Sequence, residues 1–169
     1  REDVDVSEEQ LLDFAVPGGE VTDEGLRTNV SVGVRYLDAW LNGVGAAAID
    51  NLMEDLATAE ISRAQVWQWL RYGATMSNGQ VVTADLVREV VAQQRERLTG
   101  QLPAKELDLA CRLYEVGMIS AEFEEFLTLG AYEHQDLPYE KLVLSACHPL
   151  YSATHRWVVF ARLAGEGRA

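Results

Sequence analysis

The chain has 169 residues and a formal net charge of -13, from 27 acidic and 14 basic side chains. Nucleic acids and anionic membrane surfaces are bound mainly through lysine and arginine, so we expect neither a nucleic-acid partner nor a membrane partner. The length fits one domain that can bury a core without a disulfide or a metal. The first residue is Arg1 rather than methionine, from which we expect a processed chain or a piece of a longer one.

The cysteines and histidines give no sign of a metal site. Cys111 and Cys147 fit no metal or redox spacing, so we expect two buried, reduced thiols, which suits a cytoplasmic protein. His134, His148 and His155 are not at the i, i+3 or i, i+4 spacing that places two ligands on one helix face. This favours isolated histidines and no metal in this chain.

Apolar residues recur at three- and four-residue steps, which predicts an all-α helical bundle of about six to eight helices, with residues 1–169 as a single domain. Gly33 falls inside the second helix, where we expect close packing against a neighbour. Residues 44–50 are either a buried extended segment or a tight loop, and residues 75–82 either a short hairpin or a loop. The expected helices cover about residues 8–16, 22–42, 56–72, 83–98, 103–116, a stretch starting at Ser120, 139–146 and 152–163.

The chain is organised around residues 51–73, an apolar and acidic segment that becomes an amphipathic helix and stops at Gly73. Glu54 and Asp55 lie where this helix begins. An aspartate in this place is most often an N-cap, which accepts hydrogen bonds from the first free amides. Apolar neighbours such as Met53 would instead exclude water from the carboxylate and make it a stronger base. The sequence leaves both roles open.

Two other features of this segment bear on function. A helix followed by a turn in residues 61–75 would suit a helix-turn-helix, but Arg63 and Arg71 are mixed with acidic residues, which argues against DNA binding. Trp67 and Trp69 are two residues apart and therefore face different sides of the helix. We expect Trp69 in the core and Trp67 at an interface.

Residues 32–43, together with residues 51–63 and 67–70, resemble the C-terminal helical domain of the malate synthases. A looser likeness continues through residues 126–133. The resemblance covers roughly residues 19–135, and the chain from about residue 136 forms a C-terminal extension outside it. The long, ungapped central segment makes this likeness highly specific.

The resemblance implies a helical plug over the mouth of a TIM barrel, in an enzyme of the glyoxylate cycle. The family condenses acetyl-CoA with glyoxylate and hydrolyses the thioester, which gives malate and CoA. The aspartate of the family's Met-Glu-Asp motif is the general base, and it is Asp55 in this sequence. Leu56 and Asp50 depart from the family pattern without altering this motif.

The same resemblance places the Mg²⁺ ligands, the enolate-stabilising arginine and the glyoxylate pocket in the barrel. A barrel takes roughly 250 residues, so this chain is too short to contain one. We therefore expect the barrel, in the same polypeptide or in a separate chain, as the partner of this domain. We expect the isolated chain to be inactive, and the substrate-binding residues are not identified.

A second possibility is a non-catalytic helical protein-interaction module derived from the same domain. In that case Asp55 would be dispensable for activity. An apolar patch including Trp67 and residues 46–49 would then bind another protein.

Overall fold

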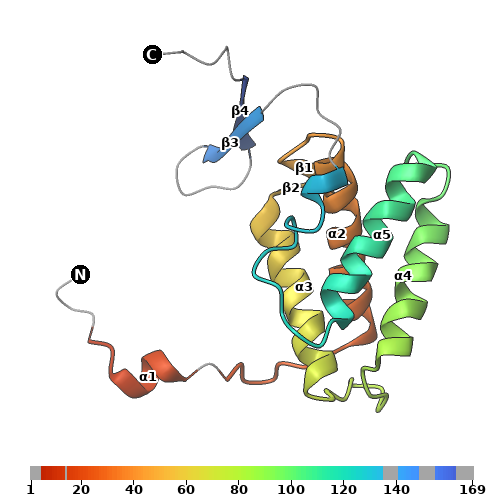
Figure 1. The fold of residues 1–169 in the computed structure, drawn as a ribbon. Helices are drawn as coiled ribbons and strands as arrows, with labels where there is room; N and C mark the ends of the chain where they lie inside the picture. The colour runs from red at the N-terminus through yellow and green to blue at the C-terminus, as the bar shows by residue number, and fades with distance from the viewer. Residues whose placement is uncertain (1–4, 14, 135–140, 149–154, 163–169) are drawn as a thin grey trace.

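The computed structural model describes residues 5–13, 15–134, 141–148 and 155–162 (Figure 1). These ranges contain five α-helices, one short 3-10 helix and two antiparallel hairpins, and no barrel of strands. The helical class is confirmed. The five α-helices and the 3-10 helix give six helices in these ranges, the lower end of the expected six to eight. The elements are α1 (Glu8–Leu12), α2 (Asp23–Leu41), β1 (Ala47–Ile49), β2 (Leu52–Glu54), α3 (Leu56–Arg71), α4 (Ala84–Leu98), α5 (Ala104–Ile119), η1 (Tyr132–His134), β3 (Lys141–His148) and β4 (His155–Arg162).

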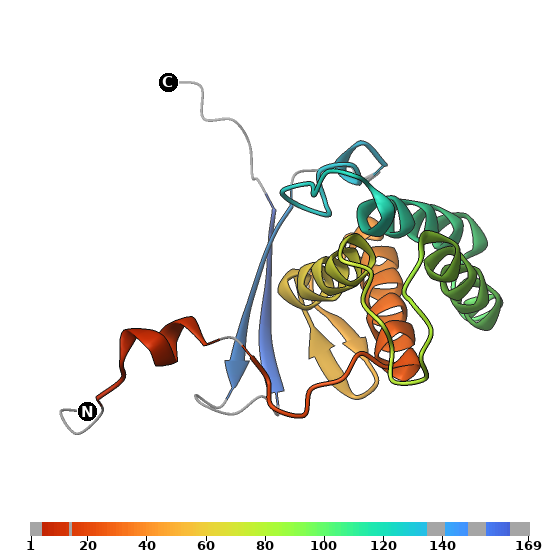
Figure 2. The ribbon, with the colours of Figure 1, turned by 90° about the horizontal axis from the view of Figure 1, so that it is seen from below.

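Helix α2 is the central element of the bundle. Figure 2 looks along the helices and shows α2 between α3 on one side and α4 and α5 on the other. The helix begins at Thr22, whose side chain accepts a hydrogen bond from the amide of Gly25 at 2.9 Å. Its apolar stripe is fully buried, because the three- and four-residue spacing places these side chains on one face. The stripe consists of Leu26, Val30, Val34 and Leu37.

Gly33 allows α2 and α5 to approach each other closely, as the sequence predicted. A Cβ atom added at Gly33 would overlap with the ring of Tyr114 on α5. Tyr114 is fully buried, and its hydroxyl donates a hydrogen bond to the carbonyl of Asn29 at 3.1 Å. A glycine at this position is therefore a requirement of packing.

The helix expected from Ser120 is wrong. Residues 120–131 form bends and turns, followed by the short helix η1. The apolar spacing of Phe123, Phe126 and Leu127 resembles that of a helix, but contacts with α3 hold this segment in an irregular path.

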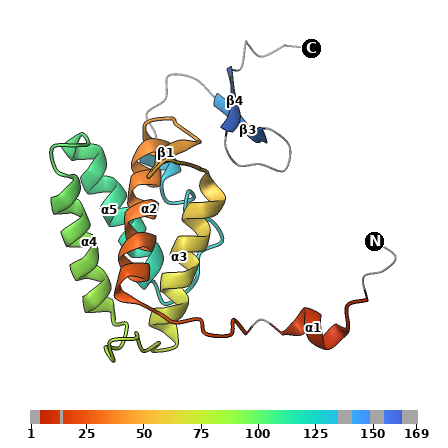
Figure 3. The same cartoon turned by 180° about the vertical axis from the view of Figure 1, so that it is seen from behind.

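The two helices expected at the end of the chain are also wrong, because β3 and β4 form an antiparallel hairpin there. Short apolar runs rich in valine and aromatic residues favour strands, and periodicity alone does not separate them from buried helices. In Figures 1 and 3 this hairpin and α1 lie apart from the bundle. Of the two open stretches, residues 44–50 contain β1, and residues 75–82 contain one isolated bridge, between Thr75 and Val81.

Candidate active site at the start of helix α3

The hairpin β1–β2 leads directly into α3. Its register pairs Ile49 with Leu52, so Asp50 and Asn51 form a two-residue turn. Both turn residues have positive φ, 50° and 65°, which is the conformation of a type I′ turn. Such a turn matches the twist of the two strands. The extended alternative for residues 44–50 is thus the correct one for β1.

Asp55 follows β2 and is the N-cap of α3, as one of the two sequence interpretations proposed. Its Oδ1 atom accepts hydrogen bonds from the amides of Ala57 at 3.0 Å and Thr58 at 3.4 Å. The residue is half-buried, and its backbone is extended. The cap fixes the carboxylate in one place, at the end of the helix where the dipole favours negative charge.

Glu54, the last residue of β2, is also directed to the first turn of α3. Its Oε2 atom accepts a hydrogen bond from the hydroxyl of Thr58 at 2.6 Å. The threonine therefore contacts both acidic residues, through its hydroxyl to Glu54 and through its amide to Asp55. The two carboxylates are held by one turn of helix.

Tyr36 is a residue of this site that sequence reasoning missed. It lies on α2, is 1% exposed, and donates its hydroxyl to the carbonyl of Gly45 at 3.1 Å. Burial, and then the negative charges of Asp55 and Glu60, raise the pKa of the Tyr36 hydroxyl to about 12. The phenol therefore remains a hydrogen-bond donor throughout the physiological range.

A buried ion pair one turn into α3 was missed as well. Arg63 is fully buried, and its Nε and Nη2 atoms donate to Oε2 of Glu60 at 3.0 and 2.7 Å. Its guanidinium lies over the ring of Phe123, 4.2 Å from the centroid, and Nη2 also donates to the carbonyl of Glu124 at 3.0 Å. The i, i+3 spacing of the pair was a visible signal, because residues three apart are neighbours on a helix.

These contacts explain why residues 120–127 are not helical. Oε1 of Glu60 accepts the amide of Leu127 at 2.6 Å, and the indole nitrogen of Trp67 donates to the carbonyl of Ser120 at 2.8 Å. Backbone groups that would bond within a helix are instead bonded to side chains of α3. The burial of Arg63 also removes it from the basic surface that a helix-turn-helix would need.

The apolar patch expected for an interaction module is mostly covered within the chain. Ala46, Ala47 and Ile49 are buried, and Trp67 packs edge-on against Phe123 with ring centroids 5.1 Å apart. Trp69 was expected in the core; it is partly buried and packs against the core from its edge.

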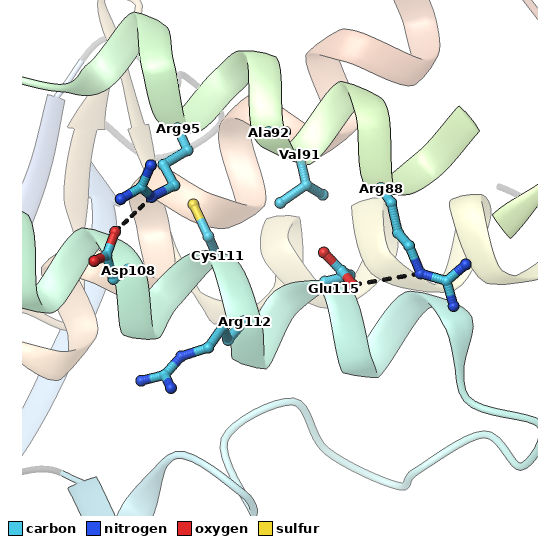
Figure 4. Close-up of a pocket in the computed structure, with 8 residues that line it drawn as sticks. All are labelled: Arg88, Val91, Ala92, Arg95, Asp108, Cys111, Arg112 and Glu115. Carbon is cyan, nitrogen blue, oxygen red and sulfur yellow. Dashed lines mark hydrogen bonds and ion pairs between the residues drawn. The ribbon is translucent and has the colours of Figure 1, made fainter. Parts of the chain in front are cut away.

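A groove between α4 and α5 has a volume of about 430 Å³ (Figure 4). Its charged residues are largely paired with one another: Arg95 contacts Asp108 at 2.5 Å, and Arg88 contacts Glu115 at 3.7 Å. Cys111 is a buried free thiol, as predicted, and burial raises its pKa to about 11. The thiol is therefore protonated and has no nucleophilic character here.

A second hollow, of about 320 Å³, lies against β1 and is lined by Asp38 among small apolar residues. Asp38 is 4% exposed, and its Oδ1 atom has no hydrogen-bond partner within the described ranges. Burial, and then the charge of Glu106, raise the pKa of the Asp38 carboxyl.

No three His, Cys, Asp or Glu side chains in the described part of the chain come together in a way that could hold a metal ion. His134 lies in η1, and the register of β3 and β4 pairs His148 with His155. The side chains of these strands, including that of Cys147, lie outside the description. In the same described ranges, no helix is both long and apolar enough to cross a membrane.

The fold and the site define a small helical domain that presents a half-buried, capped carboxylate at the end of a tight hairpin. The family model for the C-terminal domain of malate synthase matches residues 20–135, and the chain belongs to this family. The chain is similar to malate synthase of Myxococcus xanthus (strain DK1622), with 46% identity over 138 residues that cover 79% of this chain and 25% of that protein.

It is also similar to malate synthase A of Escherichia coli (strain K12), with 40% identity over 137 residues, 78% of this chain and 25% of that protein. Glyoxysomal malate synthase of Brassica napus is 42% identical over 137 residues, 76% of this chain and 24% of that protein. The chain thus spans about a quarter of the length of the curated relatives it matches.

Proposed function

We propose that Asp55 is the general base of a malate synthase and takes a proton from the methyl group of acetyl-CoA. The observation that carries this proposal is the fixed, half-buried position of its carboxylate, within the family-matching region. The methyl proton is weakly acidic, so the base must be close and well placed. A positioned general base contributes roughly 10²–10⁴ in rate.

The electron pair of the broken C–H bond remains on the substrate as an enolate. Its carbon attacks the aldehyde of glyoxylate, and water then cleaves the thioester to release malate and CoA. The glyoxylate pocket and the Mg²⁺ that the family resemblance implies are proposed to lie outside this chain. The described residues do not fit a metal site.

A barrel that packs against this domain is proposed as its partner. Large apolar side chains are exposed on β2, α3 and the segment after α5, and surfaces of this kind often mark contact sites. They include Leu52, Ile61, Phe126, Leu129 and Tyr132, which are between 47% and 67% exposed. Their exposure supports a contact with a second domain at this surface.

The test is the variant Asp55→Asn in the full-length protein. Asparagine is as good an N-cap as aspartate, so α3 keeps its start and only the base is removed. We expect CoA release from acetyl-CoA and glyoxylate to fall by about 10²-fold or more. Asp85→Asn, at an exposed carboxylate in the first turn of α4, is the control and should keep its rate. Undiminished turnover in Asp55→Asn would instead favour the non-catalytic interaction module.

A further inference from the structure

We propose that Arg35 and Tyr36, adjacent residues of α2, are positioning residues that hold the two ends of the β1–β2 hairpin and thereby place Asp55. This inference rests on the proposed function of Asp55. Consecutive residues on a helix point about 100° apart, so one short stretch of α2 can reach two separate points of the hairpin.

Tyr36 holds the open end of the hairpin. The register pairs Ala47 with Glu54, so the chain entering β1 and the chain leaving β2 lie side by side. Gly45 is two residues before Ala47, and Asp55 directly follows Glu54. The bond from the buried Tyr36 hydroxyl to the Gly45 carbonyl, 3.1 Å long, therefore anchors the end of the hairpin at which Asp55 lies.

The electrostatics of Tyr36 agree with this placement. The charge of Asp55 is the largest contribution to its raised pKa after burial. Because the hydroxyl remains protonated, the anchor does not change with pH in the range where an enzyme works.

Arg35 holds the opposite end, the tip of the turn. Its Nη1 atom lies 2.8 Å from Oδ1 of Asp50, a turn residue with φ of 50°. The hydrogen bond and charge of Arg35 lower the pKa of the Asp50 carboxyl, so the pair stays ionised at neutral pH. The hairpin is thus bonded to α2 at both ends, so Asp55, which directly follows β2, is held in one position relative to α2.

The position of Asp55 matters because the rate of proton transfer depends strongly on the distance between the base and the substrate proton. A misplacement of about 1 Å can cost roughly 10²-fold in rate. Loss of one anchor leaves the cap of α3 intact, so the expected defect is in the position of Asp55 relative to substrate and not in the presence of the base.

The experiment compares Tyr36→Phe, Arg35→Gln and the double variant in the full-length protein, with kcat, KM and thermal midpoint measured for each. We expect kcat to fall about 3- to 10-fold in the single variants and about 10- to 100-fold in the double variant, with KM for glyoxylate within about 2-fold. Arg35→Lys, which keeps the positive charge, should recover part of the Arg35→Gln loss.

Matched controls separate positioning from general stability. Tyr114→Phe removes another buried tyrosine hydroxyl bonded to a backbone carbonyl, and Arg27→Gln removes another α2 arginine that pairs with an aspartate. The hydrogen-bond partners of both side chains lie outside the hairpin, so neither variant should show a comparable loss of kcat.

If kcat of the Arg35 and Tyr36 variants falls no further than in these controls, the positioning role is wrong. In that case Asp55→Asn can still be inactive, and the proposed function would stand. If Asp55→Asn keeps its turnover, the proposed function fails, and the positioning role fails with it.

Discussion

Glu60 and Arg63 are bound to each other within α3 and together hold a segment that lies 61 to 67 residues further along the chain. One carboxylate oxygen of Glu60 accepts both Nε and Nη2 of Arg63, and the other accepts the amide of Leu127. Arg63 in turn donates to the carbonyl of Glu124. The Glu60–Arg63 pair thus supplies hydrogen bonds to backbone groups of residues 124 and 127, which are not bonded within a helix.

We expect Arg63→Met to destabilise the chain strongly. The remaining partner, Glu60, is 20% exposed and its charge would be partly solvated, so we expect a cost at the lower end of the about 3–5 kcal/mol that is typical of a buried pair. It also removes the hydrogen bond that residue 124 receives. Urea unfolding followed by circular dichroism measures the change.

Arg71→Met is the control, because Arg71 is an exposed arginine near the end of the same helix. Arg71 lies in the last turn of α3 and 6.0 Å from the ring centroid of Trp67, so its loss should change the free energy of unfolding by no more than about 1 kcal/mol. Equal effects of the two substitutions would show that the buried pair does not hold the loop.

The parts of the fold that depend on near neighbours in the sequence were predictable. The caps Thr22 and Thr83 accept hydrogen bonds from amides three residues on, so the start of α2 and α4 follows from a few residues. The irregular path after Ser120 was not predictable, because it depends on Glu60 and Arg63, which are far away in sequence.

The candidate site also contains residues that local sequence could predict and residues that it could not. Asp55 was found from its motif and from its place before a helix, both of which are local features. Tyr36 was missed because its role depends on a bond to Gly45, across a turn that the sequence left open. The hairpin itself required two residues with positive φ, which aspartate and asparagine tolerate but do not demand.

Gly33→Ala should be costly although alanine is normally the better helix former. The added Cβ would overlap with the ring of Tyr114, so α2 and α5 would have to move apart. Overpacking of this kind costs about 1–3 kcal/mol or more. Gly130→Ala is the control, because no atom lies within 4 Å of a Cβ added at Gly130. A similar thermal midpoint for the two variants would contradict the close packing at Gly33.

Asp38→Asn should stabilise the chain at neutral pH. Burial raises the pKa of Asp38 in the folded state, so the folded protein binds this proton more tightly than the unfolded chain does. Stability from this group is therefore complete below the ordinary aspartate pKa of about 3.9 and is lost as the pH rises through the raised value.

The amide side chain of the variant carries no charge, so the free energy of unfolding should exceed that of the natural protein by on the order of 1 kcal/mol at pH 7. The difference should narrow towards pH 4. Urea unfolding at several pH values measures it, with the exposed Asp85→Asn as control. If the difference in unfolding free energy between the variant and the natural protein grew at low pH, the Asp38 carboxyl would not have a raised pKa in the folded state.

Asp55 is both a cap and the proposed base, and two substitutions separate these roles. Asp55→Ala removes the acceptor of the amides of Ala57 and Thr58, and loss of an N-cap costs about 1 kcal/mol. Asp55→Asn keeps an acceptor oxygen and should unfold close to the natural protein. Both variants should lose turnover, so activity and stability would not follow one another across the pair. Equal unfolding free energies for the two variants would show that the capping bonds do not support α3, and that the carboxylate is held in place by other contacts.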